Sequence, residues 1–139
     1  MDASSMEKLL AEKGTPAKYR EKYLKLGTQL LGWKFQEATG AYRMGPYMLL
    51  HEGMALRWLR NSDGINTVLR ALFDSGYRLQ CDCWGASDSF VFQARLIRGK
   101  IPLFRGVYKG ELAATIQDAI LSAAYETLPR FLIPPEGLG

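Results

Sequence analysis

The stretch that decides the fold reads NSDGINTVLRALFDSGYRLQCDCWGASDSFVFQARLIRGK and occupies residues 61–100. Its first part carries apolar residues at helical spacing after three residues that suit a helix N-cap, and Gly76 ends that pattern. Residues 77–84 and 89–98 then alternate between apolar and polar, with turn residues at 85–88 between them. The stretch therefore predicts a helix followed by a β-hairpin.

Helices are predicted on both sides of this stretch. Downstream, residues 112–128 predict a helix that Pro129 ends, after a third short strand over 103–109. Upstream, a capping box at Ser4-Ser5-Met6-Glu7 predicts the start of one helix, and Thr15-Pro16 predicts the start of a second helix that ends at Gly32.

The middle of the chain carries weaker signals. Residues 33–44 alternate around a Thr39-Gly40 turn and predict a hairpin, and we interpret the apolar runs 47–50 and 54–59 as extended. Together these segments predict one α+β domain over residues 1–139, in which an antiparallel sheet of about four to five strands packs with helices. Its parts are a helical N-terminal extension (1–32), an α/β sandwich core (33–128) and a tail (129–139).

Composition is typical of a soluble globular protein. The chain is 47% hydrophobic and 23% charged over 139 residues, enough to bury a core without disulfides. We expect neither a signal peptide nor a membrane span, because no run approaches the roughly 18 apolar residues that a span needs. A cytoplasmic protein is the expectation. The net charge of +4 comes from the first 60 residues, which hold ten Lys and Arg against six acids.

The order of these pieces resembles the phage ABA-sandwich family. The matching features are Leu30-Leu31-Gly32-Trp33 at a helix-to-strand junction, Asp63 at a helix start, Ser75-Gly76-Tyr77 before a strand, and the helix pattern ATIQDAILSAA at 114–124. The resemblance covers roughly residues 24–128, and it implies a small viral accessory domain of no assigned activity. A longer helical N-terminus and a more apolar stretch over 44–59 depart from that family.

The two cysteines are the first candidates for a chemical role. Cys81 and Cys83 point to the same face of a strand and lie about 7 Å apart, too far for an easy disulfide. They share that face with Tyr77 and Leu79, so buried core thiols are the expectation and metal or redox chemistry is the alternative.

The single histidine is the second chemical candidate. His51 could act as a general base only with an orienting carboxylate, for which Glu52 and Asp82 are the candidates. A turn histidine without a catalytic role is the competing interpretation. We therefore expect no catalytic residues, no cofactor and no metal ligands.

The polar side of the predicted hairpin is the favoured binding surface. Arg78, Gln80 and Trp84 alternate along one strand, and Arg95 lies on the return strand. Arginines placed there can grip a carboxylate or phosphate with two parallel bonds. The alternative is a solvated sheet face on which Asp82 neutralises the arginines.

These observations predict a non-catalytic, phage-type accessory protein that binds a protein or a small anionic ligand, in host takeover or anti-defence, inside the host cytoplasm. The first alternative is nucleic-acid binding through cations near several tyrosines. The second alternative is a small enzyme that uses His51. A homodimer through residues 47–59 would explain their apolar character. The cations of the first alternative are Lys18, Arg20, Lys22, Lys25 and Lys34.

Overall fold

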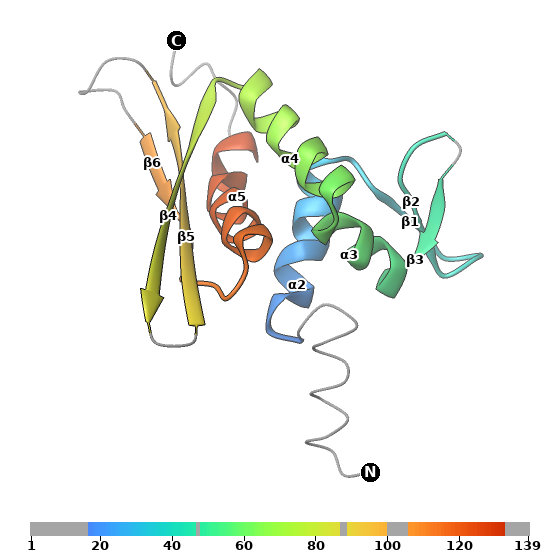
Figure 1. The fold of residues 1–139 in the computed structure, drawn as a ribbon. Coiled ribbons are helices and arrows are strands. Elements are labelled where there is room, and N and C mark those ends of the chain that lie inside the picture. The colour runs from blue at the N-terminus through green and yellow to red at the C-terminus, as the bar shows by residue number, and fades with distance from the viewer. Residues whose placement is uncertain (1–16, 47, 87–88, 100–105, 133–139) are drawn as a thin grey trace, which may run out of the picture.

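Two separate three-stranded antiparallel sheets lie on opposite sides of a layer of helices (Figure 1). The computed structural model describes residues 17–46, 48–86, 89–99 and 106–132. The helices are Ala17–Lys25 (α2), its π-helical continuation Leu26–Leu30 (η1), Glu52–Arg60 (α3), Ser62–Asp74 (α4) and Ile116–Leu132 (α5). The smaller sheet contains Lys34–Gln36 (β1), Ala41–Arg43 (β2) and Leu49–His51 (β3), and the larger sheet contains Tyr77–Ala86 (β4), Ser89–Arg98 (β5) and Gly106–Lys109 (β6).

The larger sheet is built on one long hairpin. Strands β4 and β5 pair without interruption from Tyr77 opposite Arg98 to Ala86 opposite Ser89. Strand β6 pairs with the other side of β5, so β5 is central and β4 and β6 are the sheet edges. The described helices all lie on one side of this sheet (Figure 1).

Small side chains let α5 approach β5 closely. Ala119, Ala123 and Ala124 of α5 are fully buried, as are Ala94 and Leu96 of β5. Removing this apolar surface from water contributes about 25 cal/mol per Å² and holds the helix on the sheet.

A second set of helices extends this core away from the sheet. Tyr23 and Leu26 from the first helical segment are fully buried, together with Leu59 of α3 and Val68 and Leu72 of α4. These residues and the buried face of α5 belong to one continuous hydrophobic cluster. The two sheets are therefore joined through a shared helical core.

The predicted α+β class is confirmed, but the strands are divided between two sheets instead of forming one sheet of about four to five. The hairpin over 33–44, the helix over 61–75 and the strand 89–98 are confirmed as β1–β2, α4 and β5. Strand β4 continues two residues beyond the predicted end at 84. The predicted helix over 4–14 lies outside the described residues.

The interpretation of residues 54–59 as extended is wrong, because they belong to helix α3. Ala55, Leu56 and Leu59 occupy one buried stripe at helical spacing. Glu52 in the first turn and arginines in the last turn complement the helix dipole. Gly53 lies inside the helix.

The boundaries of the last helix also differ from the prediction. Helix α5 begins at Ile116 rather than 112 and continues past Pro129 to Leu132, into the predicted tail. A proline removes one backbone hydrogen bond, and the chain can still continue as a helix beyond it. Among the described helices, none combines the length and apolar character that crossing a bilayer requires.

Candidate functional site

The candidate site is the side of the larger sheet that faces away from the helices, here called the outer face. Side chains that are directly opposite in an antiparallel pair share a face, so the register defines its members. No described helix covers this side (Figure 1). The outer face comprises Arg78, Gln80, Asp82 and Trp84 of β4, Val91, Gln93, Arg95 and Ile97 of β5, and Val107 and Lys109 of β6.

The four residues predicted to bind a partner all belong to the outer face. Gln80 is directly opposite Arg95, which is in turn directly opposite Lys109, so one row crosses all three strands. Arg78 and Gln80 are exposed, and Trp84 is 48% exposed. Trp84 lies four residues beyond Gln80 on the same strand, about 13 Å away at the usual strand rise.

Positive charge predominates on the outer face. Arg78, Arg95 and Lys109 are its cations, and Asp82 is its one carboxylate. Asp82 Oδ2 lies 3.5 Å from Arg95 Nη2, and both side chains are about one-third exposed. Arg78 has no ion pair within the part of the chain that the structure describes. An exposed guanidinium of this kind can grip a carboxylate bidentately.

Two outer-face residues are less accessible to a binding partner than strand alternation alone indicates. Gln93 is buried, and its Nε2 donates to the Gly110 carbonyl at 2.9 Å. Ile97 is also buried, in the central strand between Arg78 and Val107. The accessible part of the face therefore follows β4 and the Arg95–Lys109 pair.

The prediction that Cys81 and Cys83 are buried is wrong, because both are exposed. Their predicted orientation is right, since Cys81 is opposite the buried Ala94 on the helix side of the sheet. The difference arises because β4 is an edge strand, whereas α5 packs mainly on the central strand β5. Partial burial, followed by the nearby Asp82 carboxylate, raises the pKa of the Cys81 thiol.

The cationic residues of the nucleic-acid alternative are largely paired with carboxylates. Arg20 contacts Glu52, Lys22 Nζ lies 3.3 Å from Glu111 Oε1, and Lys25 Nζ lies 3.4 Å from Glu21 Oε1. Lys18 lies over the Tyr19 ring, 4.8 Å from its centroid, and Lys34 is exposed on β1.

Two of the tyrosines near these cations are inaccessible. Tyr19 and Tyr23 are buried and stack on each other with ring centroids 5.2 Å apart. Base stacking needs an exposed ring face, which these two residues do not offer.

His51 lies exposed at the end of β3, where its Nδ1 is 3.4 Å from the Gly40 carbonyl oxygen. The carboxylate of Glu52 contacts Arg20, and that of Asp82 contacts Arg95 on the larger sheet. Neither candidate carboxylate makes a contact with the imidazole in the described part of the chain. The general-base arrangement that an enzyme would need is therefore not formed by these residues.

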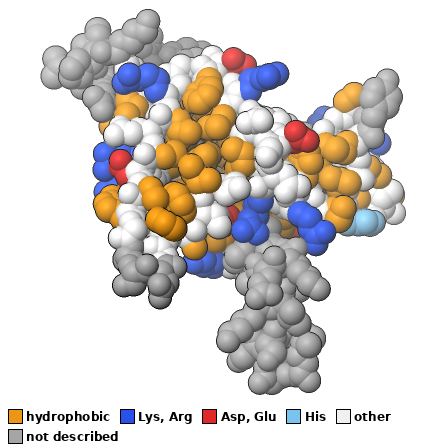
Figure 2. Space-filling model, viewed as in Figure 1, with side chains coloured by type: hydrophobic (Ala, Val, Ile, Leu, Met, Phe, Trp, Pro, Cys, Tyr) orange, Lys and Arg blue, Asp and Glu red, His pale blue; other side chains and the backbone are white. Residues whose placement is uncertain are grey.

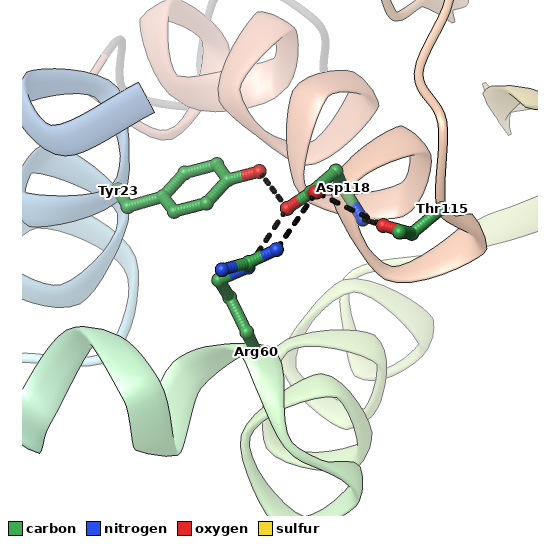
Figure 3. Close-up of polar contacts among 4 residues, drawn as sticks. All are labelled: Tyr23, Arg60, Thr115 and Asp118. Atoms are coloured by element: carbon green, nitrogen blue, oxygen red, sulfur yellow. Dashed lines mark hydrogen bonds and ion pairs between the residues drawn. The ribbon is translucent and has the colours of Figure 1, made fainter. Parts of the chain in front are cut away.

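A buried polar cluster that sequence reasoning missed lies among the helices (Figure 3). Asp118, 4% exposed, accepts hydrogen bonds from Tyr23 Oη at 2.6 Å and from Thr115 Oγ1 at 2.9 Å. Arg60 donates to both carboxylate oxygens, from Nε and Nη2, at 3.1 Å each. The cluster thus ties α2 and α3 to the start of α5.

The geometry of this cluster is that of a link between helices. Burial, and next the hydrogen bond to Asp118, raise the pKa of Tyr23, so its phenol stays protonated. The Asp118 N–H also donates to Thr115 Oγ1 at 3.1 Å, which caps the helix. The Thr115-x-x-Asp118 spacing is a capping signal that could have located the start of α5.

Comparisons with protein-family models, with curated proteins and with solved structures found no match to this chain. Within the described residues, no three His, Cys, Asp or Glu side chains are grouped as metal ligands.

Proposed function

We propose that this chain is a non-catalytic accessory protein that binds an acidic surface of another protein through the outer face of its larger sheet. The observation that carries the proposal is the combination of Arg78, Arg95 and the exposed Trp84 on a face that no described helix covers. Arginine and tryptophan are enriched where protein interfaces concentrate their binding energy.

The shape of this surface favours a protein over a small ligand. Small-molecule sites are usually concave and bury most of the ligand. A pleated sheet face instead presents side chains over a broad area, here from Trp84 on β4 to Lys109 on β6. Carboxylates on a partner could pair with the arginines while an apolar group packs against the indole of Trp84.

The resemblance to the phage ABA-sandwich family supplies a biological setting for this proposal. A viral accessory protein of that kind would act on a host protein, in host takeover or anti-defence, without performing chemistry. Hosts of phages are bacteria, so a bacterial lysate is the appropriate source of partners.

Affinity capture with mass spectrometry tests the proposal. The full chain should retain an acidic bacterial protein, and Arg78→Ala with Arg95→Ala should abolish that retention. Arg78 is exposed and has no ion pair among the described residues, and the partly exposed Arg95–Asp82 pair contributes at most about 1 kcal/mol, so the double variant should remain folded. Trp84→Ala should weaken retention through the lost apolar contact.

A matched control removes two cations elsewhere. Lys34 of β1 and Arg70 of α4 are both exposed and lie on other elements. Lys34→Ala with Arg70→Ala should retain the partner as the unmodified chain does. Equal retention by the Arg78→Ala and Arg95→Ala double variant would refute the proposed face. Captured nucleic acid, lost steeply as salt rises, would instead support the nucleic-acid alternative.

A further inference from the structure

Strand β4 is an unusually long edge. It runs for ten residues in a continuous register with β5, with no bulge to twist it away. The other described edge strands are shorter, with four residues in β6 and three each in β1 and β3. Proteins commonly protect edges with short strands, bulges, prolines or lysines, because unpaired backbone groups recruit another strand. Residues 77–86 contain neither proline nor lysine.

Exposed apolar side chains lie next to this edge, on the helix side of the sheet. Cys81 and Cys83 are exposed there, and Phe90, opposite Gly85, is 64% exposed. Phe73 at the end of α4 is also exposed. Figure 2 shows hydrophobic side chains gathered on this side of the molecule, over the region between the larger sheet and the helices. A strand added to β4 would cover part of this surface.

We propose that the occupant of this edge is a second copy of the chain, whose β4 pairs antiparallel with the first about a twofold axis through Gln80. The sequence Arg78-Leu79-Gln80-Cys81-Asp82 is complementary to itself in that arrangement. Arg78 of each copy faces Asp82 of the other, so two opposite-charge pairs form at once. On the helix side, Leu79 faces Cys81 of the second copy.

Neighbouring registers lack this complementarity. An axis through Cys81 would place Arg78 opposite Trp84 and Gln80 opposite Asp82, which leaves the arginine without a carboxylate. An axis through Asp82 would place two carboxylates directly opposite each other, which is repulsive. The charge pattern therefore selects the register centred on Gln80.

The resulting dimer would have one six-stranded sheet with β6 at both ends. Asp82 would lie between Arg95 of its own chain and Arg78 of the second copy. The Arg95–Lys109 pair lies on the strands beyond β4, so this part of the outer face would be repeated on both halves, whereas Arg78 would be paired with Asp82 of the second copy. This inference goes beyond the proposed function and does not depend on it.

Charge reversal tests the pairing directly. The unmodified chain should sediment as a dimer at micromolar concentration. The Arg78→Glu variant alone, or the Asp82→Arg variant alone, replaces the two attractive charge pairs of the dimer with two repulsive ones. Each variant should raise the dimer dissociation constant by about tenfold. An equimolar mixture of the two variants should dimerise again, because each places opposite charges against the other. Lys109→Glu makes the same charge change at the other edge and should leave dimerisation unaltered.

Cysteine crosslinking tests the register. In a Cys81→Ser, Cys83→Ser background, Gln80→Cys places two thiols opposite each other on the axis, within the Cα separation of about 4.4–6.8 Å that a disulfide requires. Arg78→Cys in the same background places its two thiols about 13 Å apart along the strands. The first variant should form a covalent dimer on mild oxidation, and the second should not.

Several results would overturn the inference. They are a monomer at all concentrations of the unmodified chain, a dimer indifferent to charge reversal, or equal crosslinking of the two cysteine variants. Far-UV circular dichroism of each variant confirms that an altered association state does not reflect unfolding. Because sedimentation is measured without any partner protein, a monomeric chain would overturn this inference and leave the proposed capture through Arg78, Arg95 and Trp84 as a separate result.

Discussion

Asp118→Ala should be the most destabilising of the single substitutions considered for this protein. It removes the acceptor of the Tyr23 hydroxyl at 2.6 Å, the Thr115 hydroxyl at 2.9 Å and two Arg60 donors at 3.1 Å. Breaking a buried ion pair costs about 3–5 kcal/mol. The Arg60 side chain keeps 23% exposure, which places the expected loss near the lower end of that range, at about 3 kcal/mol.

Urea unfolding followed by far-UV circular dichroism measures this loss. Tyr23→Phe alone removes one hydrogen bond to a charged group and should cost about 1.5–3 kcal/mol. In the Asp118→Ala background the same change should cost much less, because its acceptor is already gone. Asp74→Ala, an exposed carboxylate at the end of α4, is the control and should stay within about 0.5 kcal/mol of the unmodified chain.

A loss below about 1 kcal/mol for Asp118→Ala would refute the reasoning, since ordinary surface substitutions stay within about 0.5 kcal/mol. Full additivity of the Tyr23 and Asp118 substitutions would refute it as well. Either result would mean that the hydrogen bonds of Figure 3 do not tie α2 and α3 to α5 in solution.

Three further predictions concern packing, pH and thiol reactivity. Gly27→Ala should lower the free energy of unfolding by about 1–3 kcal/mol because the new Cβ would overlap the buried Trp33 ring. Gly53→Ala, in open space inside α3, should raise it by about 0.5–1 kcal/mol, and urea titration compares the two. The raised pKa of Tyr23 means that its phenol ionises more readily in the unfolded chain, at about pH 10. The stability from this shift is complete below that pH and is lost as the pH rises above it, so Tyr23→Phe should flatten the alkaline decline in stability. The Cys81 thiol should react with iodoacetamide in the folded protein, at a rate that still climbs above pH of about 8.5 because its pKa is raised. Mass spectrometry that found no label before unfolding would contradict its exposure.

Local sequence signals predicted the β4–β5 hairpin and helix α4 well, because residues close together in the sequence specify each of them. The α4 helix follows from apolar residues at three- and four-residue spacing, and β5 from strict alternation over 89–98. Helix α3 was missed because a short apolar run does not distinguish a strand from a buried helix by periodicity alone. In the structure, Ala55, Leu56 and Leu59 share one buried stripe of this nine-residue helix.

For the candidate site, the sequence predicted only which side of the strand each residue lies on. Alternation assigns Arg78, Gln80 and Trp84 to the same side of β4, and the register shows this directly. The exposure of Cys81 depends on where α5 packs, and that position depends on contacts distant in the sequence. The division of the strands into two sheets has the same origin, since strand patterns do not specify which strands become neighbours.

The Asp118 cluster has a consequence for the order of folding events. Its acceptor meets donors that are 95 and 58 residues away along the chain. Closing such long loops costs conformational entropy before any contact compensates for it, which slows folding. The β4–β5 hairpin needs only local closure and should form early. A chain cut before Ile116 would keep both strands of that hairpin but lose helix α5, and with it the carboxylate that unites the helices.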